Sequence, residues 1–319
     1  MNFASAMALV SAGMAFAIAG NDFAKPASGF ACDLLAACHE PATCPAMSET
    51  PPAKFSVTFE TTAGNFTVTT VTAWAPPYAR RFWQLSRIGY MDGAPFYRVD
   101  RINATTAWVV QFGYRGEPDV DKCWEDKRTD NTTWSVHKPG NVRGTVAFSM
   151  NAVPPSPLLP NCTSEQYCAQ GFSTNIFINY ANNSRLDAPG FSVFGYIEAG
   201  GMRVVDRFYS EYGEVSDLCG GNSTQKSAAG NNFCNGHGDA CKGVSMSRLL
   251  NEGHAYWSSE RPKLDSILSV TISKHPKMDD GIYQEGAEKW LSYEDGEDEV
   301  RRDSDSQRRG KRELLRLLS

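Results

Sequence analysis

The chain lacks an excess of positive charge. Its 319 residues include 31 Lys and Arg against 36 Asp and Glu, a formal net charge of -5. Because binding to a phosphate backbone needs a cationic surface that displaces counterions, this balance argues against a nucleic-acid-binding protein. Familiar catalytic arrangements are missing as well, since the sequence has only five His and shows no Ser-His-Asp order, no Gly-rich phosphate loop and no paired carboxylates.

Long apolar runs are also scarce. Residues 1–20 carry the longest one, which ends in the small-x-small pattern Ala17-Ile18-Ala19. This predicts a secretory signal peptide over residues 1–20, with a short buried helix as the alternative. No other stretch reaches the roughly 18 apolar residues that a membrane-spanning helix needs, so the sequence predicts no membrane span.

Cysteine is present in quantity and in clusters. The clusters are Cys32, Cys38 and Cys44; Cys123; Cys162 and Cys168; and Cys219, Cys234 and Cys241. They predict disulfides that close local loops in an oxidising compartment, with at least one thiol left over because nine is odd. A zinc site at Cys234-x-x-His237-x-x-x-Cys241 is the less favoured alternative.

Potential glycosylation sites point to the same compartment. Six Asn-x-Ser/Thr sequons stand at Asn65, Asn103, Asn131, Asn161, Asn183 and Asn222. Because such sequons accept glycans only in the secretory pathway, we expect a disulfide-bonded glycoprotein that is secreted or resides in the endoplasmic reticulum lumen.

The organised part of the chain reads as many short strands. Residues 54–71 alternate apolar and polar residues around a break at 63–65, which predicts a β-hairpin with one buried face. A last strand fits 264–272, and helices fit 76–88 and 202–212. Five further β-rich segments are 96–99, 108–112, 144–150, 176–178 and 191–195. So many strands with only two helices favour a closed barrel over a parallel α/β sheet.

Composition divides the rest of the chain. Residues 21–53 are expected to form an irregular Cys-containing leader before a main domain over 54–273. The domain is predicted to carry insertions at 153–172 and 213–255. The charged tail, 274–319, is typical of solvated disorder, with a frayed amphipathic helix near its end as the alternative.

Five short motifs, in this order, resemble those of the cyclophilin family of peptidyl-prolyl cis-trans isomerases. They are Phe96-Tyr97-Arg98-Val99, Trp108-Val109-Val110-Gln111-Phe112-Gly113, Gly144 to Met150, Thr174 to Ile178, and Leu186-Asp187 with Val193-Phe194-Gly195. The resemblance covers about 54–272, interrupted by the two insertions. It implies a mainly β fold, a closed eight-stranded antiparallel cyclophilin-like barrel with two capping helices.

The resemblance also implies an activity. Rotation about an Xaa-Pro amide faces a barrier of about 18–20 kcal/mol, because the nitrogen lone pair is shared with the carbonyl. By resemblance, Arg98 donates to the prolyl nitrogen and weakens that sharing, while Gln111 orients Arg98. Neither a cofactor nor a metal is implied, and the expected partners are proline-containing segments of client proteins in the secretory pathway.

By resemblance the substrate is bound by a set of further residues. These are Tyr97, Trp108, Val109, Asn151, Asn175, Phe177, Leu186 and Phe191. Several depart from the usual family residue, and Arg185 replaces the Trp on which cyclosporin binding commonly depends, so we expect weak cyclosporin binding. These departures keep two alternatives open: a catalytically weakened proline-peptide binding module, and a disulfide-rich structural protein in which the barrel is only a scaffold.

Overall fold

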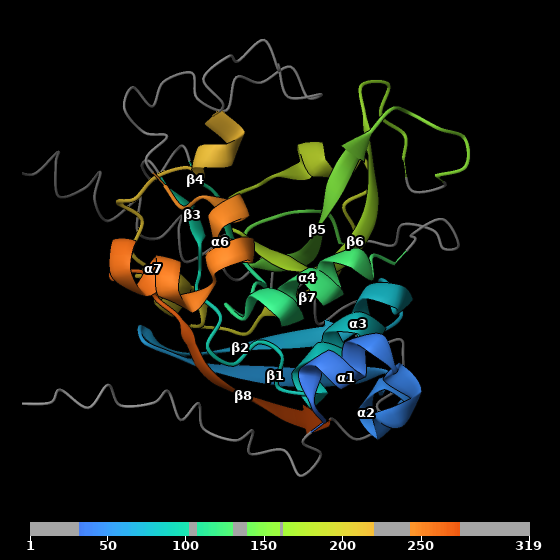
Figure 1. The fold of residues 1–319 in the computed structure, drawn as a ribbon. Coiled ribbons are helices and arrows are strands. Elements are labelled where there is room, and N and C mark those ends of the chain that lie inside the picture. The colour runs from blue at the N-terminus through green and yellow to red at the C-terminus, as the bar shows by residue number, and fades with distance from the viewer. Residues whose placement is uncertain (1–31, 102–106, 130–138, 160–161, 220–242, 275–319) are drawn as a thin grey trace, which may run out of the picture.

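Eight strands form one antiparallel sheet in the computed structural model, which describes residues 32–101, 107–129, 139–159, 162–219 and 243–274 (Figure 1). The strands are β1 (Lys54–Thr61), β2 (Gly64–Val71), β3 (Arg98–Arg101), β4 (Ala107–Phe112), β5 (Thr145–Val153), β6 (Cys168–Asn179), β7 (Val193–Ile197) and β8 (Ile267–Lys274). Their order across the sheet is β3-β4-β6-β5-β7-β2-β1-β8. The predicted mainly β, eight-stranded antiparallel architecture is therefore confirmed.

The two outermost strands of this order, β3 and β8, approach each other where the chain enters them. Pro95 and Ser266 form an isolated antiparallel bridge. Beside it, the backbone N–H of Phe96 donates to the carbonyl of Asp265 at 2.9 Å. The far ends of the sheet thus meet at one point through backbone hydrogen bonds.

The inner face of the sheet is apolar. In β1, Phe55, Val57 and Phe59 alternate with polar residues and have no exposed surface, as the period-two pattern predicts. The ring of Phe59 stacks on that of Phe66 across the hairpin, with 4.9 Å between centroids. Phe82 of helix α3 (Pro76–Arg87) packs on both Phe55 and Phe59, so the predicted helix covers this core.

The helices are more numerous than predicted. Besides α3, the described residues contain α1 (Leu34–His39), α2 (Pro45–Ser48), α4 (Pro118–Asp126), α5 (Met202–Val205), α6 (Met246–Glu252) and α7 (His254–Glu260). Only two helices were expected, and the second of them is shorter than expected because α5 ends at Val205. The others are short segments without a long apolar period. None of the helices in the described ranges is long and apolar enough to cross a bilayer.

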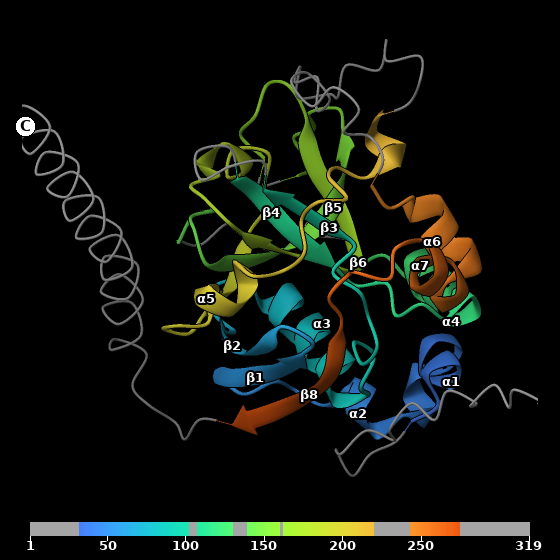
Figure 2. The ribbon, with the colours of Figure 1, turned by 90° about the vertical axis from the view of Figure 1, so that its left-hand side faces the viewer.

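Two peripheral segments pack outside the sheet. The leader, described from Cys32 to Ala53, contains α1 and α2 rather than the irregular structure expected there. The second segment, described at 213–219 and 243–260, contains helices α6 and α7 and is called the α6–α7 segment below. Figure 2 shows α1, α4, α6 and α7 stacked along one side of the molecule, with α4 between the two segments.

Six of the cysteines form three disulfides. Cys32–Cys44 and Cys162–Cys168 close short loops of the predicted kind. Cys38–Cys123 does not, because it joins the leader to α4 across 85 residues of sequence, so the expectation of local bridges alone is wrong. Disulfides are typical of oxidising compartments. Cys234 and Cys241 lie outside the described residues.

The sequons that can be placed differ in access. Asn65 is exposed in β2. Asn183 is only 1% exposed, and its side-chain nitrogen donates to the carbonyl of Trp108 and to Oδ1 of Asn179, both at 2.8 Å. The amide nitrogen of Asn183 is therefore committed to internal hydrogen bonds and inaccessible to a glycan. The other four sequons, the signal-peptide prediction and the predicted tail beyond Lys274 lie outside the described residues.

Candidate active site

A row of side chains crosses four neighbouring strands on the outer face of the sheet. Arg98 of β3 pairs with Gln111 of β4, Gln111 pairs with Phe177 of β6, and Phe177 pairs with Ala147 of β5. Directly opposite residues in an antiparallel pair point to the same face. Residues far apart in the sequence are thereby brought side by side by register alone.

Arg98 and Gln111 contact each other through their side chains. Nη1 of Arg98 donates to Oε1 of Gln111 at 3.2 Å. Nη2 of Arg98 donates to Oε2 of Glu214 at 2.6 Å, an ion pair in which the carboxylate side chain is 1% exposed. Sequence reasoning missed Glu214, because a single Glu in a Gly-rich stretch carries no signal of its own.

A hollow of about 550 Å³ opens beside this pair. Val109, Ala147, Phe177 and Leu186 form a small apolar cluster there, separate from the main core, and the partly buried Trp108 and Phe191 pack against it. Leu186 comes from a single 3₁₀ turn, Ser184–Leu186. Of the ten residues predicted to bind or act on substrate, the hollow is lined by Arg98, Trp108, Val109, Gln111, Asn151, Asn175, Phe177, Leu186 and Phe191.

One rim of the hollow carries a cation stacked on an aromatic ring. The guanidinium carbon of Arg185 lies 3.4 Å from the centroid of the Trp108 ring. Burial lowers the pKa of Arg185, and the neighbouring Tyr167 and Asp100 oppose that effect. One face of the Trp108 ring is therefore covered by Arg185.

Tyr97 is absent from the lining residues and lies behind the hollow. It is 1% exposed, and its hydroxyl donates to Oδ1 of Asn175 at 2.9 Å. Burial raises the pKa of Tyr97 well above its ordinary value, so the phenol stays protonated and remains a donor. Burial likewise raises the pKa of Tyr114, whose hydrogen bond with Asn175 opposes the shift. Two neutral tyrosines thus fix the amide of Asn175.

Gly113 allows the strands to come this close. Its φ of +130° is one that residues with a side chain rarely adopt, and a Cβ there would lie 2.3 Å from the carbonyl oxygen of Thr174. The glycine therefore lets the chain after Gln111 pass directly over the strand that carries Asn175.

Polar residues from other elements complete the rim. Glu125 and Arg128 form an ion pair at the end of α4, and Nη1 of Arg128 also donates to the carbonyl of Gly171 at 3.1 Å. Asn151 is exposed and sits opposite Gln170 in the β5–β6 pairing. Sequence reasoning missed Glu125 and Arg128, because α4 was not predicted.

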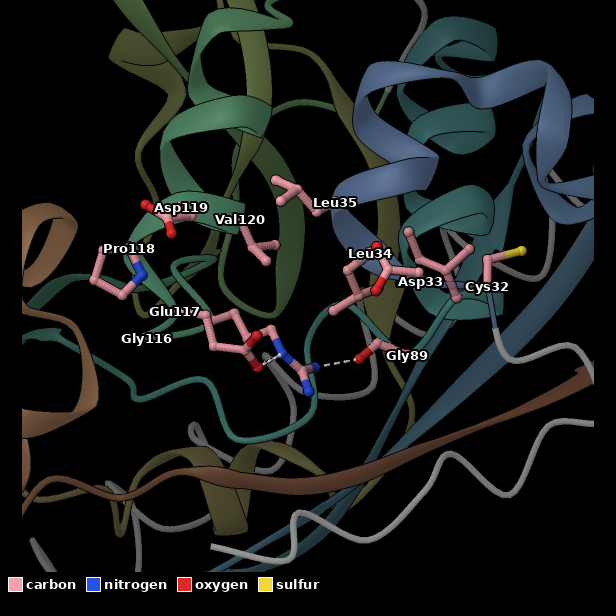
Figure 3. Close-up of a pocket in the computed structure, with 12 residues that line it drawn as sticks. Cys32, Asp33, Leu34, Leu35, Gly89, Gly116, Glu117, Pro118, Asp119 and Val120 are labelled. Carbon is pink, nitrogen blue, oxygen red and sulfur yellow. Dashed lines mark hydrogen bonds and ion pairs between the residues drawn. The ribbon is translucent and has the colours of Figure 1, made fainter.

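A second cavity, of about 590 Å³, lies between the leader and α4 (Figure 3). Its lining includes Arg115, whose Nε pairs with Glu117 at 2.5 Å and whose Nη1 donates to the carbonyl of Gly89 at 2.7 Å. The charge of Arg115 is thus engaged within the protein. Among the described residues, no three His, Cys, Asp or Glu side chains gather to hold a metal ion, and the zinc-like spacing lies outside them.

Comparison with known proteins bears on the predicted resemblance. The solved structures similar to this chain include a cyclophilin type peptidyl-prolyl cis-trans isomerase of Cryptosporidium parvum, at 12% identity and a TM-score of 0.40, covering 70% of this chain and 99% of that one. The same protein in the presence of the dipeptide Ala-Pro aligns at 12% identity and a TM-score of 0.39, covering 69% and 99%. Comparison with curated proteins finds no match.

A match to a family model shows the family. The model described as cyclophilin type peptidyl-prolyl cis-trans isomerase/CLD matches residues 56–226, more than half of the chain. The match begins within β1, extends past β7 and includes every residue of the row from Arg98 to Phe177. The predicted resemblance is confirmed, and the chain belongs to the cyclophilin type peptidyl-prolyl cis-trans isomerase/CLD family.

Proposed function

We propose that the chain catalyses cis-trans isomerisation of Xaa-Pro peptide bonds, with Arg98 as the catalytic residue. One observation carries the proposal: Arg98 and Gln111 are hydrogen-bonded to each other at 3.2 Å in the wall of an apolar hollow large enough for a proline ring. A donor and an apolar seat side by side are what this reaction requires, since it forms and breaks no covalent bond.

Arg98 supplies the donor. A guanidinium N–H directed at the prolyl nitrogen attracts the lone pair, reduces its sharing with the carbonyl and so favours the twisted amide over either planar form. Arginine keeps its charge at ordinary pH, so the donor is always present. Gln111 accepts from Nη1 and so orients the guanidinium, while its amide is also available to the peptide backbone.

The surrounding residues bind the substrate in this proposal. Val109, Phe177 and Leu186 seat the proline ring, with Trp108 and Phe191 at its edges. Asn175 and Asn151 contact the peptide backbone, and Tyr97 acts from behind by holding Asn175. Since Arg185 stacks on one face of Trp108 at the rim of the hollow, we also propose that cyclosporin binds weakly.

Finer features of the fold and its compartment belong to the same proposal. We infer that the sheet is closed as a barrel and capped by α3 and α5, which the bridge between Pro95 and Ser266 supports. The substrates are proline-containing segments of client proteins in the secretory pathway. The three disulfides and the apolar run in residues 1–20 support that location.

A second candidate is a proline-peptide binding module with little catalysis. The buried ion pair with Glu214 favours it, because the carboxylate occupies one N–H of Arg98 and offsets its charge. Such a module would bind an Ala-Pro peptide without accelerating its isomerisation, so affinity and rate must be measured separately.

The test is NMR exchange spectroscopy of an Ala-Pro peptide with the full chain and with Arg98→Ala. We expect the wild type to accelerate exchange and Arg98→Ala to lower kcat/KM by about 10²–10³-fold, the usual loss when an electrostatic donor is removed. Arg98→Lys should recover little, because an ammonium lacks the planar fork of donors.

Arg80→Ala serves as the matched control, since Arg80 is an exposed arginine on α3, and it should leave the rate unchanged. A wild type that leaves the spontaneous rate unchanged would overturn the enzyme. If that wild type still shifts the peptide resonances, the binding module takes its place.

A further inference from the structure

The ion pair between Arg98 and Glu214 is the most buried ion pair in the described part of the chain. The two side chains are 10% and 1% exposed, and the shortest N–O distance is 2.6 Å. The second carboxylate oxygen, Oε1, accepts the backbone N–H of Val215 at 2.7 Å. Both oxygens of Glu214 are therefore bound, and the carboxylate has almost no contact with solvent.

Glu214 is itself held by two chain segments that flank residues 220–242. The backbone N–H of Gly243 donates to the carbonyl of Glu214 at 3.2 Å, and that of Ser216 donates to the carbonyl of Val244 at 3.0 Å. A Cβ at Gly243 would lie 2.1 Å from the same carbonyl oxygen of Glu214, so only glycine allows this approach. Val215 and Val244 are fully buried in the cluster that contains Tyr97. The backbone of Glu214 is thus held beside the cluster that contains Tyr97, the residue before Arg98.

The guanidinium of Arg98 is held on both of its terminal nitrogens. Gln111 takes one hydrogen of Nη1 and Glu214 takes one hydrogen of Nη2. The buried Nε–H has no hydrogen-bond partner among the described residues. Two anchors on different nitrogens define the plane of a rigid guanidinium, which leaves its remaining donors at fixed positions.

Glu214 is not among the residues that line the hollow, although Arg98 is. Its carboxylate cannot contact a peptide seated there except through Arg98. Any effect of Glu214 on the reaction must therefore pass through the position or the charge of the guanidinium, and the two can be told apart by the sign of the effect.

We propose that Glu214 is a positioning residue for the isomerase reaction: it holds the guanidinium of Arg98 in the plane from which a free N–H reaches the prolyl nitrogen. The proposal rests on the function proposed above for Arg98. A donor that is already oriented needs no reorganisation as the amide twists, which is where preorganised electrostatic catalysts gain their rate. Without Glu214, the buried cation loses its counter-charge and turns toward other acceptors or water.

The test compares Glu214→Gln and Glu214→Ala with the wild type in the Ala-Pro exchange assay. We expect Glu214→Ala to lower kcat by about 10–100-fold with KM within about twofold, because the anchor is lost and the hollow is intact. Glu214→Gln should lose only about three- to tenfold, because the amide oxygen still accepts from Nη2 without the charge. Glu211→Gln, an exposed glutamate three residues earlier, is the matched control and should change neither constant.

A second readout does not depend on activity. In protein labelled with ¹⁵N-arginine, rotation about the Nε–Cζ bond of Arg98 should be slow in the wild type, faster in Glu214→Gln and fastest in Glu214→Ala. Circular dichroism and thermal unfolding identify a variant that does not fold, in which case Glu214→Gln alone decides the matter.

The possible failures are distinct. If Arg98→Ala is inactive but both Glu214 variants keep the wild-type kcat and slow rotation, Glu214 is not a positioning residue and the proposed function stands. If a Glu214 variant has a higher kcat than the wild type, the carboxylate lowers the activity of Arg98 by occupying an N–H and offsetting its charge, and the positioning role is overturned. If the wild type has no activity, the proposed function fails. If rotation about the Nε–Cζ bond of Arg98 is then also the same in the Glu214 variants as in the wild type, Glu214 does not orient Arg98 either.

Discussion

The leader and the α6–α7 segment both pack outside the sheet, and they are attached in different ways. The leader is joined to α4 by the Cys38–Cys123 disulfide and to α3 by the ion pair between Glu49 and Arg87 at 2.9 Å. The α6–α7 segment has no disulfide among its described residues and is attached by apolar packing and by Glu214.

Only the second attachment reaches the candidate site. No described residue of the leader lines the hollow, whereas Met246 of α6 does and Glu214 pairs with Arg98. A covalent link far from the proposed catalytic residue can increase stability without changing the reaction rate. An attachment made through Arg98 itself must affect both stability and rate. The following predictions test that difference.

The largest effect is expected from Leu249→Ala in α6. Leu249 is fully buried in the cluster with Tyr97, Tyr256 and Trp257, so the variant should lose about 2–5 kcal/mol of unfolding free energy. Since that cluster also supports Glu214 and the hydroxyl that holds Asn175, kcat/KM should fall by roughly threefold or more, at a temperature where the variant is folded. Urea denaturation and the Ala-Pro exchange assay measure the two quantities. Lost stability with unchanged kcat/KM would make this segment as passive as the leader.

A smaller effect, on stability alone, is expected when the leader is released. Replacing Cys38 and Cys123 together by Ser removes a cross-link across 85 residues and should lower the unfolding free energy by about 2–4 kcal/mol. The exchange rate per folded molecule should stay within about twofold of the wild type, because neither cysteine lines the hollow. The matched control replaces Cys162 and Cys168, whose short loop predicts a smaller loss of stability. A clear fall in kcat/KM on releasing the leader would erase the contrast between the two segments.

The sheet could be predicted from the sequence, and most of the structure of the two peripheral segments could not. A segment of each of the eight strands was predictable, mostly from apolar residues repeated on one face, although β6 begins at Cys168, inside the insertion expected at 153–172. The row from Arg98 to Phe177 was predictable through motifs whose order follows the strands. The strands and this row depend on patterns among residues close in the sequence, which can be recognised in a single chain.

The peripheral segments depend on contacts between distant residues, which no local pattern records. Cys38 lies between two other cysteines, so its spacing favoured a local bridge, yet its partner is Cys123 on a helix that was not predicted. Glu214 follows Gly213 in a stretch without periodicity and gains its importance only from the fold, which places it 2.6 Å from Arg98. Tyr97 was assigned to the substrate from its position beside Arg98, whereas its side chain is buried in the cluster with Tyr114 and Val215 and contacts Asn175 from behind the hollow.

The smallest of the three effects concerns α4, on which both segments rest. Asp121 of α4 is fully buried and accepts the hydroxyl of Tyr90 at 2.7 Å and the backbone N–H groups of Arg115 and Gly116, both at 2.8 Å. The carbonyl of Gly116 in turn accepts the N–H of His254 at the start of α7. Burial outweighs these hydrogen bonds and raises the pKa of Asp121 from its ordinary 3.8 to about 6.

A raised carboxyl pKa means that the folded chain holds this proton up to a higher pH than the unfolded chain does. The stabilisation is fully present below pH 3.8 and is lost as the pH rises through 6, a total of about 2–3 kcal/mol. Asp121→Asn, which cannot ionise, should therefore gain that amount of unfolding free energy relative to the wild type between pH 3.8 and pH 7. Urea denaturation at a series of pH values measures it.

Asp92→Asn is the comparison for this effect, because burial also raises the pKa of Asp92 to about 6 against the opposing charge of Arg115, and Asp92 accepts the N–H of Val270 in β8 instead of a group on α4. Both variants should reduce the pH dependence of stability, but only Asp121→Asn removes a charge that forms beneath the leader and the α6–α7 segment together. If the difference between Asp121→Asn and the wild type stays constant across this pH range, Asp121 is ionised in the folded chain throughout. Its three hydrogen bonds then offset the effect of burial on the pKa, and the contribution of Asp121 to the unfolding free energy does not change with pH in this range.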